Sequence, residues 1–213
     1  RITHGCLGLY SDDCEATLAR ALAAARRVAG PAKFGIQLAH AGRKASAQVP
    51  WEGGQALHDD QDPWPTVSAS AIAFDAGWHV PQPLDDDGMD RVTDAFVHAA
   101  RRAVRLGFEV VELHSAHGYL LHQFLSPLSN QRDDAYGGTL ADRLRFPLQV
   151  LEAVRAVVPS SVALGMRISA TDWVDGGWDV DDSIEYVGAA QSVGIDYVCV
   201  SSAGLTAQAR VPI

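Results

Sequence analysis

Hydrophobic positions along the chain follow two periods, one helical and one typical of strands, and the two periods alternate. Leu18, Leu22, Ala25 and Val28 recur at helical spacing, whereas residues 33–39 alternate between large apolar and small or polar side chains. The same succession occurs four times. The predicted helices are 12–28, 89–104, 139–154 and 181–193, and the predicted strands are 33–39, 108–113, 162–168 and 197–200. Helices that alternate with strands predict a parallel α/β sheet.

Two stretches interrupt this pattern. Pro147 lies inside the third predicted helix and should kink it or separate its first two turns. Residues 40–88 show no clear period and contain Trp51, Trp64 and Trp78. A stretch of this length without periodicity predicts a long functional loop, here with a short hairpin.

Two parallel folds compete for this alternation. A doubly wound nucleotide-binding sheet should carry a G-x-G-x-x-G motif between a strand and a helix, and the sequence has none. In a (β/α)₈ barrel, polar residues instead gather at the carboxyl ends of the strands, where the active site lies. The polar residues at or just after the predicted strand ends are Gln37, His40, His114, His117, Arg167, Ser201 and Ser202. The sequence therefore predicts a TIM barrel.

The length limits how much of the barrel is present. A complete barrel needs roughly 250 residues and eight strands, whereas this sequence has 213 residues and four predicted strands. We therefore expect residues 1–213 to form the central portion of a single barrel domain, with about four strands and four helices, truncated at both ends.

Charge and cysteine content narrow the classes of partner. With 47% hydrophobic and 20% charged residues the composition is that of a globular protein. A net charge of −9 argues against nucleic acid and anionic membranes, which require a basic patch. No apolar run approaches about 18 residues, so no membrane span is expected. Cys6, Cys14 and Cys199 are too scattered for a disulfide framework or a zinc motif, which favours a reduced, cytoplasmic setting.

The segment 112–138 is the richest in reactive side chains. His114 and His117 lie three residues apart where a strand becomes a loop, and Tyr119 follows. Two imidazoles that donate N–H to one oxygen, with a phenol in reach, can polarise and protonate a carbonyl compound. The alternatives are a zinc site with His122 as a third ligand, two structural histidines, and a Tyr119 ring that only packs.

Two strand residues are candidates for binding a cofactor. Arg167 should point into the barrel, where a buried cation needs an anion or several acceptors. It could form an ion pair with Glu112 or bind an electron-rich cofactor ring. The amide of Gln37 can donate and accept at once, which suits an imide-like edge. Lys44 could be an ordinary solvated loop charge.

Several sequence segments, taken together, resemble those of a known protein family. GIQLAHAGRK (35–44), ELHSAHGYLLHQFLSPLSNQR (112–132), DAYGG (134–138), RLRF (143–146) and GMRIS (165–169) resemble the Old Yellow Enzyme family of flavin-dependent ene reductases, most closely its bacterial NADPH dehydrogenase branch. The resemblance implies an FMN-binding TIM barrel that oxidises NADPH and reduces activated C=C bonds of small molecules.

The same resemblance implies roles for individual residues. His114 and His117 are expected to bind the carbonyl or nitro oxygen of the substrate, Ser115 and Ala116 to line the same pocket, and Tyr119 to donate a proton.

On the cofactor side, the resemblance implies that Gln37 and Arg167 bind the pyrimidine edge of FMN and that Lys44 lies in a loop near the site. The family's flavin-tuning residue lies on a first strand that the sequence does not include, and Cys6 and Cys14 are misplaced for that role.

Three alternatives remain at the level of function and assembly. An iron–sulfur flavoprotein of the same barrel type, such as a dienoyl-CoA reductase or an amine dehydrogenase, could carry its cluster beyond residue 213. A fragment or scaffold without catalytic activity is the second alternative. The barrel could also form a homo-oligomer.

Overall fold

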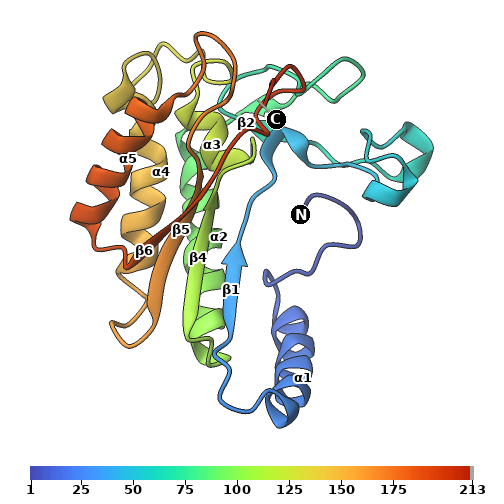
Figure 1. Ribbon diagram of the computed structural model, residues 1–213. Coiled ribbons are helices and arrows are strands. Elements are labelled where there is room, and N and C mark those ends of the chain that lie inside the picture. Colours follow the sequence, from blue (N-terminus) through green and yellow to red (C-terminus); the bar gives the residue numbers. More distant parts are fainter. Residues whose placement is uncertain (212–213) are drawn as a thin grey trace.

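A four-stranded parallel sheet forms the centre of the computed structural model, which describes residues 1–211 (Figure 1). The strands are β1 (Gly35–Leu38), β4 (Val110–Ser115), β5 (Ala163–Ser169) and β6 (Tyr197–Ser201). Their order in the sheet is β1-β4-β5-β6, so the strands of this sheet lie side by side in the order in which they occur along the chain. All four predicted strands are confirmed, with ends that differ by a few residues.

Within residues 1–211, five α-helices accompany the sheet: α1 (Asp12–Val28), α2 (Asp86–Arg105), α3 (Leu120–Leu125), α4 (Leu140–Arg155) and α5 (Val180–Val193). The four long ones are those predicted, and each begins at a side chain that accepts a hydrogen bond from a first-turn N–H. These capping residues are Ser11, Asp85, Thr139 and Asp179. None of the helices described within residues 1–211 is long and apolar enough to cross a membrane.

The two faces of the sheet differ in character. One face carries Leu38, Val111, Leu113, Leu164 and Met166, all buried, and helices α2, α4 and α5 lie along it (Figure 1). The opposite face carries polar residues in register across the strands. Helices confined to one face of a sequentially ordered parallel sheet are the arrangement of a barrel segment, whereas a doubly wound sheet has helices on both faces.

Pro147 does not separate the first turns of its helix, so that part of the expectation is wrong. Helix α4 continues from Leu140 to Arg155 through the proline. A proline in a helix interior costs about 3 kcal/mol, and buried side chains on both sides of it, including Phe146 and Val150, anchor both halves of α4 in the core.

The segment between β1 and α2 is irregular, as predicted, and an antiparallel bridge between Ala47 and Ala56 forms a short hairpin in it. Its two short strands, β2 (Val67–Ser68) and β3 (Gln82–Pro83), pair in parallel. Three single-turn 3₁₀ helices precede them, at Gly42–Lys44, Pro50–Glu52 and Asp59–Gln61. A parallel pair needs a crossover instead of a tight turn, and residues 69–81 provide it.

Candidate active site

The carboxyl end of β4 brings three of the predicted site residues together. His114 lies near the end of the strand, and His117 and Tyr119 lie in the turn that leads to α3. The His114 ring packs edge-on against both others, with centroid separations of 5.0 Å to His117 and 4.8 Å to Tyr119. The structure therefore brings the three side chains together, and their roles stay a prediction.

A chain of hydrogen bonds fixes the proton positions of the histidine pair. Ala116 donates its N–H to His114 Nδ1 at 3.2 Å, so the proton of a neutral His114 ring is on Nε2. That Nε2 lies 3.2 Å from His117 Nδ1, which must accept. The proton of His117 is then on Nε2, 2.8 Å from the Ser201 hydroxyl oxygen. Each imidazole thus donates to the next group in the chain.

The surroundings keep both imidazoles neutral and the phenol protonated. Burial, reinforced by the repulsion that a protonated His117 and the Arg167 cation would exert, lowers the pKa of His114 to about 3. Burial and the Arg167 charge also lower the pKa of His117. Burial raises the pKa of Tyr119, with a smaller contribution from Cys6. At neutral pH the site therefore presents neutral N–H donors and one phenolic proton.

Lys44 is a partly buried residue of the site and not a solvated loop charge, so that alternative is wrong. Its Nζ donates to the His117 carbonyl at 3.0 Å and to the Gly204 carbonyl at 2.9 Å. The ammonium also lies over the rings of Phe74 and Tyr119, 4.5 and 5.4 Å from their centroids. Burial, and then the neighbouring Arg43, lower the pKa of Lys44 to about 8.

Two glycines allow the turn after β4 to contact the loop after β6 backbone to backbone. Gly118 has φ +72, and a Cβ there would lie 2.2 Å from the Gly204 carbonyl oxygen. A Cβ on Gly204 would in turn lie 2.6 Å from the Cα of His117. No larger residue fits at either position without separating the two segments.

Arg167 lies beside His114 in the strand register and has no anionic partner among the described residues. Its Nε is buried without a hydrogen-bond partner, and none of the ion pairs within residues 1–211 includes it. The alternative of an ion pair with Glu112 is therefore wrong. Glu112 instead accepts from Gln37 Nε2 at 2.6 Å and from the Tyr197 hydroxyl at 3.0 Å.

His122 does not join the histidine pair as a metal ligand. Its Nδ1 accepts the N–H of Gly118 at 2.9 Å, and its Nε2 lies 3.1 Å from Asp172 Oδ1. With both nitrogens engaged inside the protein, His122 has no free lone pair for zinc, and the zinc alternative is not supported.

Ser115 and Ala116 are buried between the two histidines. The Ser115 hydroxyl lies 3.0 Å from that of Tyr186 on α5, so its side chain points toward the helical layer. Ala116 serves the site through its N–H to His114. Both residues can contribute to a pocket only through their backbone and, at Ala116, a methyl group.

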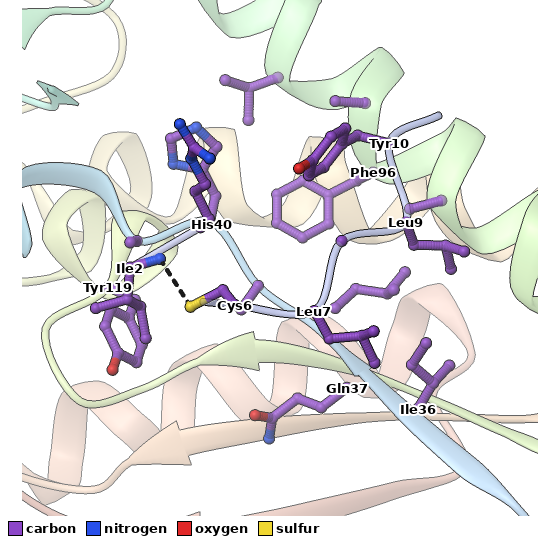
Figure 2. Close-up of a pocket in the computed structure, with 18 of the residues that line it drawn as sticks. Ile2, Cys6, Leu7, Leu9, Tyr10, Ile36, Gln37, His40, Phe96 and Tyr119 are labelled. Atoms are coloured by element: carbon purple, nitrogen blue, oxygen red, sulfur yellow. Dashed lines mark hydrogen bonds between the residues drawn. The ribbon is translucent and has the colours of Figure 1, made fainter. Parts of the chain in front are cut away.

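A cavity of about 400 Å³ runs along the free edge of β1 toward Tyr119 (Figure 2). Gln37, His40 and Tyr119 line it together with Cys6, whose Sγ accepts the N–H of Ile2 at 3.3 Å. Burial opposes ionisation of Cys6, but hydrogen bonds from Thr3 and Ile2 give its thiol a lowered net pKa. The sequence did not point to Cys6 as a lining residue, because it lies in an irregular segment before α1.

Comparison with known proteins identifies the family. Residues 3–212 match the NADH:flavin oxidoreductase / NADH oxidase family. The chain is 38% identical to NADH:flavin oxidoreductase FG08077 of Gibberella zeae, over all of this chain and 54% of that protein. It is also 38% identical to an NADPH dehydrogenase of Listeria monocytogenes, over 96% of this chain and 55% of the relative. The chain therefore belongs to the NADH:flavin oxidoreductase / NADH oxidase family.

Solved structures agree with this assignment. Morphinone reductase superposes with a TM-score of 0.72 at 28% identity, over 91% of this chain and 53% of that one. A 2-naphthoyl-CoA reductase superposes with a TM-score of 0.80 at 25% identity, over 95% of this chain and 31% of that one. The likeness to these barrel enzymes confirms a partial TIM barrel. Family membership confirms the predicted resemblance to flavin oxidoreductases, and curated relatives of this chain are named NADPH dehydrogenase. The chain spans about half the length of the curated relatives it matches.

Proposed function

We propose that the whole protein uses NADPH to reduce activated C=C bonds of α,β-unsaturated carbonyl or nitro compounds, and that residues 1–213 are the central portion of its FMN-binding barrel domain. The observation that carries this proposal is the neutral pair of His114 and His117, 3.2 Å apart and in contact with the protonated Tyr119. Neutral N–H donors beside a proton source suit a substrate whose oxygen gains negative charge in the transition state.

The polar residues on the open face of the sheet fit the flavin. A flavin presents carbonyl oxygens and one N–H along its pyrimidine edge. The buried, unpaired Nε of Arg167 can donate to such an oxygen. Gln37 uses one N–H for Glu112 and retains its carbonyl oxygen and its second N–H. When bound, FMN supplies the hydride, after its own reduction by NADPH.

The residues of this chain would then divide the remaining tasks. His114 donates to the substrate oxygen through Nε2. His117 can donate to the same oxygen through Nδ1 if its proton moves to that nitrogen, and Ser201 can then donate its hydroxyl proton to the vacated Nε2. Tyr119 holds the proton that is delivered to Cα of the substrate.

A second candidate is an iron–sulfur flavoprotein of the same barrel type. The structural likeness to 2-naphthoyl-CoA reductase favours it, because that protein is a reductase of a CoA ester, as a dienoyl-CoA reductase is. Cluster-binding cysteines outside residues 1–213 would distinguish this candidate.

We also propose that the whole protein is cytoplasmic and acts on small-molecule substrates. A homo-oligomeric assembly stays a prediction.

The proposal is tested by ligand binding to the flavin-loaded, full-length protein. His114→Ala and His117→Ala should each weaken phenol binding, measured by calorimetry, far more than they weaken FMN binding. Loss of one donor to a developing oxyanion should also slow reduction of an unsaturated ketone by about 2–4 kcal/mol in activation free energy. His98→Ala, which removes an exposed histidine from α2, is the matched control. Phenol binding by both variants at the parent affinity would place the substrate oxygen elsewhere.

A further inference from the structure

His117 has an unusual backbone conformation for a residue other than glycine. Its φ is +56, in the left-handed region that residues with a Cβ rarely adopt. Such a conformation costs of the order of 1–3 kcal/mol and persists only where surrounding contacts impose it. The contacts that impose it therefore determine where the imidazole lies.

Both backbone polar groups of His117 are held by side chains from distant parts of the chain. Ser169 Oγ, at the end of β5, accepts the His117 N–H at 2.9 Å. Lys44 Nζ donates to the His117 carbonyl at 3.0 Å. Because neither group is left to water or to the turn itself, His117 is fixed on both sides.

Ser169 also joins His117 to the loop after β6. Its hydroxyl donates its one proton to the Ala203 carbonyl at 2.8 Å, and the same oxygen accepts the N–H of His117. Ala203 has φ +62 and lies next to Gly204, the second acceptor of Lys44. The Ser169 side chain is 1% exposed, so no water can readily replace it.

We propose that Ser169 is a positioning residue of the active site. It holds His117 in the left-handed conformation and thereby aims the imidazole at the substrate oxygen, with Lys44 holding the opposite side of the same residue. This inference rests on the proposed function, because it assumes that the His114–His117 pair binds the ligand oxygen. Ser169 itself touches neither substrate nor cofactor in this role.

The chain offers a closely matched control for Ser169. Ser183 on α5 is also buried, accepts an N–H from the Trp178 indole at 2.7 Å and donates to the Ala170 carbonyl at 2.9 Å. Removal of its hydroxyl breaks the same kinds of hydrogen bond without touching His117. Any effect common to both serines therefore reports stability and not positioning.

A double-mutant cycle that combines Ser169→Ala with His117→Ala tests the proposal in the flavin-loaded, full-length protein. Ser169→Ala should weaken phenol binding by roughly tenfold, the effect of losing the bonds to one or two buried polar groups, and leave FMN affinity within about twofold. Ser183→Ala should leave phenol affinity unchanged. In the His117→Ala background Ser169→Ala should add no further loss, because the residue that it positions is gone.

The possible failures are distinguishable. If Ser169→Ala binds phenol like the parent, or weakens binding equally with and without the His117 imidazole, the positioning role is refuted while the proposed function stands. If His117→Ala alone leaves phenol affinity unchanged, the proposed function fails at the histidine pair and the positioning role fails with it.

Discussion

The contact between Gly118 and the loop after β6 gives the sharpest prediction, through the substitution Gly118→Ala. An alanine in a left-handed conformation costs roughly 1–2 kcal/mol. Its Cβ would also lie 2.2 Å from the Gly204 carbonyl oxygen, where ordinary contact begins at 3.4 Å. The two segments must therefore separate by 3.4 − 2.2 = 1.2 Å. Overpacking of this kind costs about 1–3 kcal/mol more.

The separation also displaces the site. His117 precedes Gly118 in the chain, and Lys44 bridges the His117 and Gly204 carbonyls, so the imidazole must move with the turn. A misplacement of about 1 Å can cost roughly 10²-fold in rate. Ketone reduction should therefore fall by about that factor, and phenol affinity should fall with it.

Gly138→Ala is the matched control. Gly138 has φ +79, close to that of Gly118, but nothing lies within 4 Å of a Cβ there. Urea unfolding should show a loss of about 1–2 kcal/mol for Gly138→Ala and a clearly larger loss for Gly118→Ala. Equal losses in the two variants, with parent-like phenol affinity in both, would refute the close packing described for Gly118.

Three further predictions concern the reacting side chains. Tyr119→Phe should leave the rate of flavin reduction by NADPH near that of the parent, while turnover of an unsaturated ketone falls by roughly 10²–10⁴. Stopped-flow measurement of the two half-reactions tests this, and equal losses in both would instead indicate that Tyr119 shapes the pocket. Nitrogen NMR of histidine-labelled protein should show the His117 proton on Nε2 without ligand and on Nδ1 with a bound ketone, and a ring that keeps its Nε2 proton would exclude donation from Nδ1. The pKa of His114 is about 3 in the folded protein, against an ordinary value of 6.5. Between pH 6.5 and 5 the His114 imidazole is therefore protonated in the unfolded chain but not in the folded protein. Acidification to pH 5 should therefore lower the unfolding free energy by about 2 kcal/mol through this group, and His114→Gln should remove that part of the pH dependence; an identical pH profile for parent and variant would contradict it.

Local signals were sufficient for most of the secondary structure. The four long helices have capping side chains and amphipathic spacing, and both are features of neighbouring residues. Helix α3 escaped prediction because all six residues of Leu120–Leu125 are buried, so the segment has no polar face and no helical period. The parallel pair β2–β3 consists of two-residue strands that only tertiary contact can define.

The candidate site was only partly accessible from the sequence. Strand-end position and the family resemblance identified the histidines, Tyr119, Lys44, Gln37 and Arg167. Two of the groups that hold them escaped because they lie far away in the chain: Ser169 is 52 residues from His117, and Gly204 is 160 residues from Lys44. Ser201 belongs to the predicted strand-end residues, but its contact with His117, 84 residues away, was not predictable. No local period links residues at such separations, and a serine near a strand end has no distinguishing feature until its partner is known.

The unpaired state of Arg167 follows from the layer of residues directly below it. Gln37, Glu112, Gly165 and Tyr197 are in register across the four strands. A Cβ at Gly165 would lie 2.2 Å from the Tyr197 ring, so the glycine makes room for that ring to lie across β5, where its hydroxyl reaches Glu112. With a second bond from Gln37, both carboxylate oxygens of Glu112 are satisfied within their own layer. A carboxylate that is already paired has little to gain from the cation above it, so the Arg167 guanidinium stays available for an acceptor on the open face of the sheet.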